Sequence, residues 1–82
     1  MIVTGEQLRG ARAMCRIEQS ELAERAGVSV DTIKRLERTA GPISANIKTI
    51  NAVVKTLEAA GVVFIDENGS GAGVRLRKPA EG

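Results

Sequence analysis

The stretch that decides the fold runs from Gln19 to Glu37 and reads QSELAERAGVSVDTIKRLE. Its apolar positions recur at helical spacing in two short runs, Leu22 with Ala23 and then Ile33 with Leu36. Between these runs, Gly27 supplies the positive φ that commonly ends a helix before a tight turn, and Val28 can fill the corner. Ser29 can cap the helix that follows. The stretch therefore predicts two helices joined by a tight turn.

Helical spacing continues on the N-terminal side of this stretch. Thr4 can cap a first helix that ends near Arg16. The apolar side of this helix consists of Leu8, Ala11 and Cys15. The second helix is expected over residues 18–26, and the third runs from its serine cap to about Arg38. Three helices are thus expected before the first proline.

A loop and a fourth helix follow. The stretch Thr39–Ser44 contains Gly41 and Pro42, and proline cannot continue a helix from the preceding turn. Apolar residues then recur at alternating intervals of four and three, through Ile43, Ile47, Ile50, Val54 and Leu57. We expect this stripe to end at Gly61 and to lie in the core, or in the core and a dimer interface.

The pattern changes after the fourth helix. Residues 62–65 form a dense β-prone run, residues 74–77 alternate apolar with basic, and Asp66–Gly73 reads as the turn between them. We expect a β-hairpin whose second strand shows a basic side to solvent. The chain is therefore predicted to be mainly α and one domain, with a helical bundle over 1–61, its hairpin over 62–78 and a disordered tail over 79–82.

Composition excludes several classes of protein. The chain has 82 residues, no histidine and one cysteine, so we expect no enzyme activity, no metal site and no cofactor. Cys15 is interpreted as a small buried hydrophobe rather than a reactive thiol. No apolar run approaches the ~18 residues that a membrane span needs, and no signal peptide is recognisable, which predicts a cytoplasmic protein. The net charge of +2 is too small to identify a partner by itself.

The central residues resemble a known family. The pattern consists of Gln19, Leu22, Ala23, Ala26, Gly27, Val28, Ser29, Ile33, Leu36 and Glu37. It resembles the helix-turn-helix of phage repressors, Cro proteins and xenobiotic-response-element (XRE) regulators, over about residues 8–57. The resemblance implies a lambda-repressor-like bundle and an ion pair between Arg12 and Glu37. Two features depart from the family: Glu18 stands where serine or threonine usually caps the second helix, and residues 38–42 lack the usual asparagine and glycine.

The resemblance also implies which residues contact duplex DNA. The third helix would enter the major groove, with Val30, Asp31, Thr32 and Arg35 facing the bases. The residues nearer the phosphates would be Gln19, Ser29, Lys34 and Arg38. Arg35 is the strongest candidate for reading a base, because a guanidinium can engage O6 and N7 of guanine together. The plainer alternative is that these basic residues form the solvated side of an ordinary helix.

These expectations lead to one predicted function and one competing class. We predict a sequence-specific transcriptional regulator of double-stranded DNA, a repressor or autoregulator, that acts as a homodimer because one short helix contacts too few base pairs. In the competing class, an interaction module or antitoxin-like regulator, the fourth helix or the hairpin binds a second protein.

Overall fold

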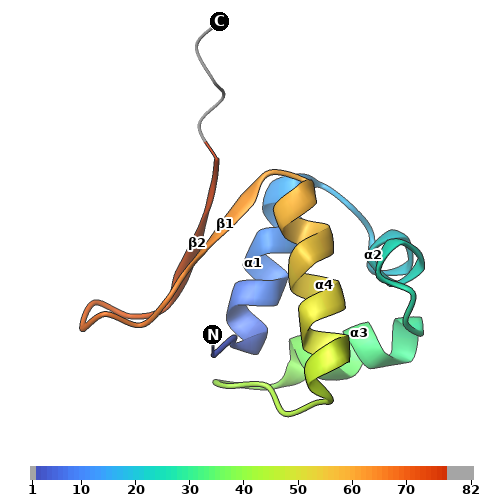
Figure 1. Cartoon of the computed structure of the whole chain (residues 1–82), viewed down its shortest axis with the longest axis horizontal. Helices are drawn as coiled ribbons and strands as arrows, with labels where there is room; N and C mark the ends of the chain where they lie inside the picture. The colour runs from blue at the N-terminus through green and yellow to red at the C-terminus, as the bar shows by residue number, and fades with distance from the viewer. Residues whose placement is uncertain (1, 78–82) are drawn as a thin grey trace, which may run out of the picture.

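A computed structural model describes residues 2–77, and within them four helices are followed by a two-stranded antiparallel sheet (Figure 1). The elements are α1 (Gly5–Cys15), α2 (Gln19–Ala26), α3 (Val30–Arg38), α4 (Ile47–Ala59), β1 (Val62–Ile65) and β2 (Gly73–Leu76). The predicted fold class, a helix-turn-helix bundle with a C-terminal hairpin, is confirmed. The tail expected over 79–82 lies outside the described residues.

Side-chain caps begin α1 and α3, and a glycine in the left-handed conformation ends α2. The Thr4 hydroxyl accepts from the Gln7 amide at 3.0 Å, and the Gln7 side chain accepts from the Thr4 amide at 2.8 Å, which makes a capping box. Ser29 caps α3 by accepting from the Thr32 amide at 3.1 Å. Gly27 ends α2 with a φ of 72°, as predicted for the tight turn.

The fourth helix begins later than the sequence suggests. Asn46 caps it, its side chain accepting from the Lys48 amide at 2.7 Å. Ile43 lies in the preceding loop, where its amide donates to the Val3 carbonyl at 2.9 Å. Ile43 packs partly against the core from this loop, so the predicted helical stripe does not begin at Ile43. Ile47 is 65% exposed and lies outside the core, and its place in a dimer interface stays a prediction. Backbone bonds and a bridge to the N-terminal segment hold this loop, in which Gly41 has a φ of 77°, and the helix begins only after Asn46.

All four helices and the first strand contribute to one apolar core. Its members are Val3, Leu8, Ala11, Leu22, Ala23, Ile33, Leu36, Val53, Val54, Leu57 and Val62. Cys15 is half-buried against this core, and burial raises the pKa of its thiol. Among the described residues, no helix combines the length and the apolar character that crossing a membrane requires.

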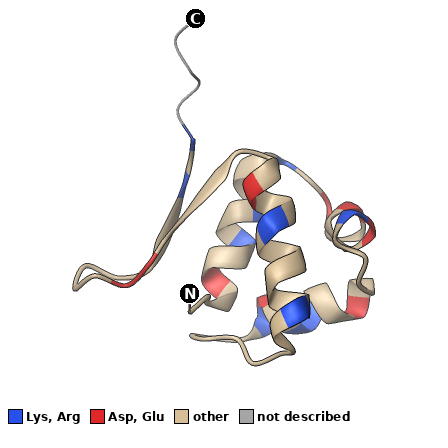
Figure 2. Cartoon of the chain, viewed as in Figure 1, with Lys and Arg blue, Asp and Glu red and all other residues tan. Residues whose placement is uncertain are grey.

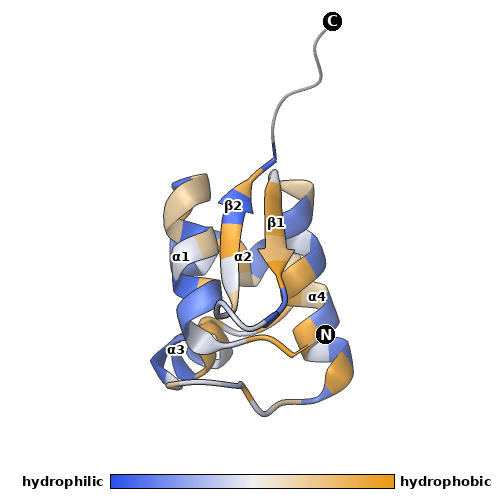
Figure 3. Cartoon of the chain, turned by 90° about the vertical axis from the view of Figure 1, so that its left-hand side faces the viewer, coloured by the Kyte–Doolittle hydropathy of each residue, from blue (hydrophilic) through white to orange (hydrophobic). Residues whose placement is uncertain are grey.

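The hairpin packs on α1 and α4 and shares their core (Figure 3). Val62 pairs with Leu76, and Phe64 pairs with Val74 two positions further along the ladder. The side chains of Phe64 and Val74 pack against the core, whereas Leu76 remains 53% exposed. The second strand is 73–76 rather than the predicted 74–77. Its first two residues are half-buried and its last two are exposed, so β2 is covered only toward the turn.

Two contacts that no sequence pattern predicts join α1 to the hairpin and to α3. The buried Gln7 donates its side-chain amide to the carbonyls of Ile65 and Gly73, at 3.1 and 3.0 Å, and so holds the end of the hairpin against α1. Gly5 approaches the end of α3 so closely that an added Cβ would overlap the Thr39 carbonyl oxygen and lie 2.8 Å from that of Leu36. α1 therefore fixes both the hairpin and α3.

Candidate nucleic-acid interface

The helix-turn-helix is built from α2, the turn at Gly27 and α3. The Val28 amide donates to the Ala23 carbonyl at 3.0 Å, which closes the turn, and the Val28 side chain packs partly against the core. On α3, Ile33 and Leu36 are at most 1% exposed. Because both side chains are held in the core, the opposite side of α3 is fixed toward the solvent.

An ionic network holds the C-terminal end of α3. Arg12 Nε lies 2.8 Å from Glu37 Oε2, and Arg12 Nη2 donates to Glu37 Oε1 at 3.1 Å. The hydrogen bond to Glu37 raises the pKa of Arg12. Gln19 also donates to Glu37 Oε1, at 3.2 Å. The structure thus contains the ion pair that the family resemblance implied, and it gives Gln19 a structural contact in addition to its proposed place beside a phosphate.

Arg9 adds a contact that the sequence analysis missed. Its Nη1 donates to the carbonyl of Glu37, while the rest of the side chain is exposed. Arg9 precedes Arg12 by three residues, so both lie on the same side of α1. That spacing is the signal from which the contact could have been found. Two arginines of α1 therefore hold the last turn of α3, one through its backbone and one through its carboxylate.

The four predicted base-facing residues differ in how far they are exposed to solvent. Asp31 and Arg35 are exposed, and Thr32 is half-buried. Val30 is half-buried and packs partly against the core, three residues before the buried Ile33, and its role as a base-facing residue stays a prediction. The hydroxyls of Ser29 and Thr32 lie 2.9 Å apart and bond to each other. A DNA contact by either hydroxyl would have to share or replace this bond.

Charge is distributed unevenly along α3. Asp31 lies in its first turn and Arg35 with Arg38 in its last, an arrangement that complements the helix dipole. Lys34, Arg35 and Arg38 are exposed, and their side chains make no hydrogen bond or ion pair with the described residues. Figure 2 shows basic positions along α3 and an acidic position in its first turn. The outer side of α3 is therefore a basic surface without a partner within residues 2–77.

The two departures from the family pattern are also visible. Glu18 stands at the cap position of α2, but its side chain makes no capping hydrogen bond. The loop after α3 is held instead by α1, because the Glu6 carboxylate accepts from the Gly41 amide at 3.0 Å. This loop is thus shaped by contacts with the N-terminal segment.

The comparisons with known proteins agree with this geometry. A helix-turn-helix domain family model matches residues 4–63, which include all four helices and the beginning of β1. A comparison with curated proteins gives no match. The matched segment covers most of the chain and contains both the turn at Gly27 and the exposed side of α3. The chain therefore belongs to the helix-turn-helix domain family, a DNA-binding class.

Proposed function

We propose that this protein is a cytoplasmic, sequence-specific transcriptional regulator of the XRE and Cro type, which inserts α3 into the major groove of duplex DNA. One observation carries the proposal. The inner side of α3 is locked by Ile33, Leu36 and Glu37, while Lys34 and Arg35 extend from its outer side without a protein partner among residues 2–77. A rigid helix with a free basic side is what major-groove recognition requires.

The outer residues differ in what they can recognise. Arg35 presents a planar guanidinium that can bond to O6 and N7 of one guanine. Lys34 and Arg38 are flexible cations suited to phosphates, and Asp31 can accept from N4 of cytosine. Of these four, only Asp31 is repelled by the phosphates, a cost that is the same for every sequence, and a cytosine N4 donor opposite it would offset that cost.

The proposal also includes that the protein binds DNA as a homodimer and represses transcription. One α3 of nine residues contacts few base pairs, and two half-sites read by two copies supply the missing specificity. Repression needs no effector domain, because occupation of a promoter is sufficient. A second candidate function is an interaction module or antitoxin-like regulator, favoured by Leu76, which leaves 53% of its surface exposed at the end of the hairpin.

Selection of bound sequences from a random duplex pool tests the proposal. The selected duplex and a scrambled duplex of equal length are then compared by fluorescence anisotropy at fixed salt. We expect the selected duplex to contain two symmetric half-sites and to bind at least about 1,000-fold more tightly. Equal binding to both duplexes would reject sequence-specific recognition, and no binding to either would favour the interaction module. Sedimentation of the full chain, alone and with the selected duplex, tests the dimer.

A further inference from the structure

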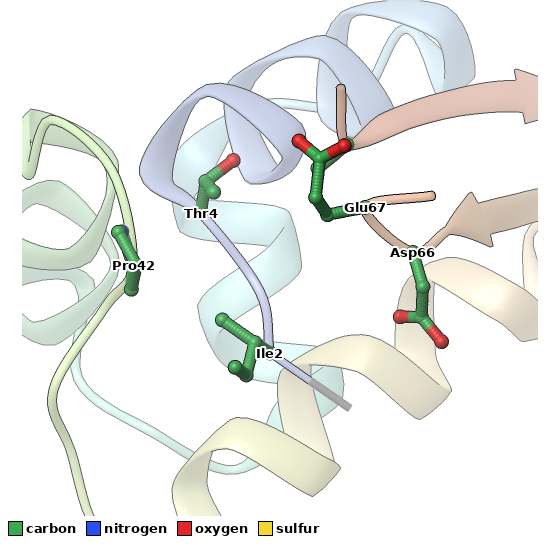
Figure 4. A pocket seen from close by; sticks show the side chains of 6 residues that line it. Ile2, Thr4, Pro42, Asp66 and Glu67 are labelled. Carbon is green, nitrogen blue, oxygen red and sulfur yellow. The ribbon is translucent and has the colours of Figure 1, made fainter. Parts of the chain in front are cut away.

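The N-terminal part of α1 is fixed against the loop that follows α3. Thr4, just before α1, forms an antiparallel bridge with Pro42 of this loop, and Figure 4 shows the two segments beside each other. The Gly5 amide donates to the Gly41 carbonyl at 3.1 Å, and the Glu6 carboxylate accepts from the Gly41 amide at 3.0 Å. These bonds hold α1 in place beside the end of α3, and with it the side chains that α1 extends toward that end.

Arg9 is an exposed side chain of α1 that reaches the last turn of α3. Its Nη1 donates to the Glu37 carbonyl, and it forms no ion pair in the part of the chain that the structure describes. The pKa of Glu6 is lowered by bonds from its own amide and from the Gly41 amide, and to a smaller extent by the charge of Arg9. A guanidinium has five N–H donors. Arg9 therefore keeps donors for a further acceptor.

The residues of α3 proposed to lie near phosphates are neighbours of this contact. Lys34 and Arg38 are four residues apart and exposed, which places them on one side of α3. Glu37 borders that side and is bonded both by Arg9, through its carbonyl, and by Gln19, through its carboxylate. Arg9 and Gln19 thus approach the last turn of α3 from outside the helix. Arg9 adds a third cation to the two that α3 itself supplies there.

The end of α3 also presents an obstacle to DNA that Arg9 can remove. The C-terminal end of a helix carries a partial negative charge of about half a unit, which repels a phosphate. Arg9 donates to one of the last carbonyls of α3 and places a full positive charge beside it. Because this bond already holds the guanidinium, less side-chain freedom is lost when a second acceptor binds.

We propose that Arg9 contacts a phosphate of the DNA backbone beside the last turn of α3. The inference rests on the proposed function and extends it, because it assigns a DNA contact to α1, outside the helix-turn-helix. One guanidinium then has two partners. It positions the end of α3 through the Glu37 carbonyl, and it supplies the charge that the neighbouring phosphate requires.

The dependence of DNA binding on salt tests this proposal on the full chain. Fluorescence anisotropy measures binding to the selected duplex and to the scrambled duplex at several salt concentrations. Arg9→Gln should weaken both duplexes by a similar factor and reduce the slope of log affinity against log salt concentration by about one. Between about 50 and 200 mM salt, the unmodified protein should therefore lose about 3.5-fold more affinity than the variant.

Two further variants separate the charge contact from a purely structural role. Arg9→Lys keeps a cation and should retain the original slope. Arg25→Gln removes the same charge from an exposed position of α2, near Cys15 at the other end of α1, and should leave the slope nearly unchanged. Urea unfolding checks that each variant is folded. A purely structural Arg9 would lower affinity without changing the slope, so an unchanged slope in Arg9→Gln, or an equal fall in Arg25→Gln, would overturn the proposal.

The same titrations distinguish this inference from the proposed function. Sequence-specific recognition is measured by the ratio of the two affinities, whereas the Arg9 contact is measured by the slope on either duplex. Equal binding to both duplexes with a reduced slope in Arg9→Gln would reject specific recognition and support the contact. A clear preference for the selected duplex with an unchanged slope would reject the contact alone. No binding to either duplex would reject both.

Discussion

Arg12 and Glu37 form an ion pair that joins α1 to the end of α3, and their side chains are buried to different extents. The side chain of Glu37 is 3% exposed and that of Arg12 is 23% exposed. Arg12 can therefore turn partly toward water if its partner is lost, whereas the carboxylate of Glu37 cannot. With Arg12 removed, Gln19 is the remaining side chain bonded to the Glu37 carboxylate among the described residues. The two halves of the pair should thus contribute differently to stability.

Replacing Arg12 is expected to be the more damaging change. Arg12→Met should lower the free energy of unfolding by about 3 kcal/mol, because it leaves a buried carboxylate without its cation. Glu37→Gln should cost less, since the arginine can gain hydration. Arg25→Met is the matched control, because its pair with Glu21 is exposed and should contribute less than about 1 kcal/mol. Urea unfolding measures all three, and equal losses for Arg12→Met and Arg25→Met would show that Glu37 does not depend on its partner.

Gly5 is expected to tolerate no side chain. In Gly5→Ala the new Cβ would overlap the Thr39 carbonyl oxygen, and backbone on both sides must move to relieve the clash. We expect a loss of about 3 kcal/mol. Gly10→Ala is the control within the same helix, because its Cβ would meet only a methyl of Val74, at 3.3 Å, and alanine favours the helix by about 1 kcal/mol. Thermal unfolding should separate the two variants clearly, and similar melting temperatures would disprove the close approach.

Gln7 should control the hairpin separately from the helix cap. Gln7→Glu keeps the oxygen that accepts from the Thr4 amide but loses the donor to the carbonyls of Ile65 and Gly73. We expect a cost of about 2 kcal/mol. Hydrogen exchange should increase in β1 and β2 while the first turn of α1 stays protected. If exchange increases equally in both places, Gln7 acts mainly through the cap.

Arg35 and Lys34 are expected to make different contributions to DNA binding. Arg35→Ala should cost about 1–3 kcal/mol at one base pair of each half-site and relax the preference there. Lys34→Ala should weaken binding to all sequences by a similar factor. It should also reduce the slope of log affinity against log salt concentration by about one. Anisotropy titrations on the selected duplex and its single-base variants measure both. An equal loss on every duplex for Arg35→Ala would make Arg35 a phosphate contact and leave base reading to Val30, Asp31 and Thr32.

Acid should weaken the contacts made by two glutamates. Bonds from its own amide and then from the Gly41 amide lower the pKa of Glu6, and those from Gly71 and Gly69 lower the pKa of Glu67. A lowered folded-state pKa gives stabilisation that is complete above the ordinary value of 4.5 and is lost as the pH falls through the lowered value. E6Q combined with E67Q should therefore flatten the fall in stability below about pH 4. Glu24→Gln, exposed on α2, is the control, and an unaltered acid profile in the double variant would contradict the prediction.

Several site features could not be predicted because they join residues far apart in the chain. Gln7 reads as an ordinary polar helix residue until a hairpin more than fifty positions away supplies its partners. The bond from Gln19 to Glu37 forms only because the fold brings the start of α2 to the end of α3.

The sequence by itself determined the features that depend on neighbours along the chain. The caps at Thr4 and Ser29, the turn at Gly27 and the buried side of α3 follow from hydrogen bonds and spacings that span a few residues. Only the tertiary structure decided where α4 begins, because the Ile43 amide donates to the Val3 carbonyl and so holds Ile43 in the loop before the helix. A local pattern shows where apolar residues recur, but the path of the N-terminal segment, distant in the sequence, decides which of them are buried in the core.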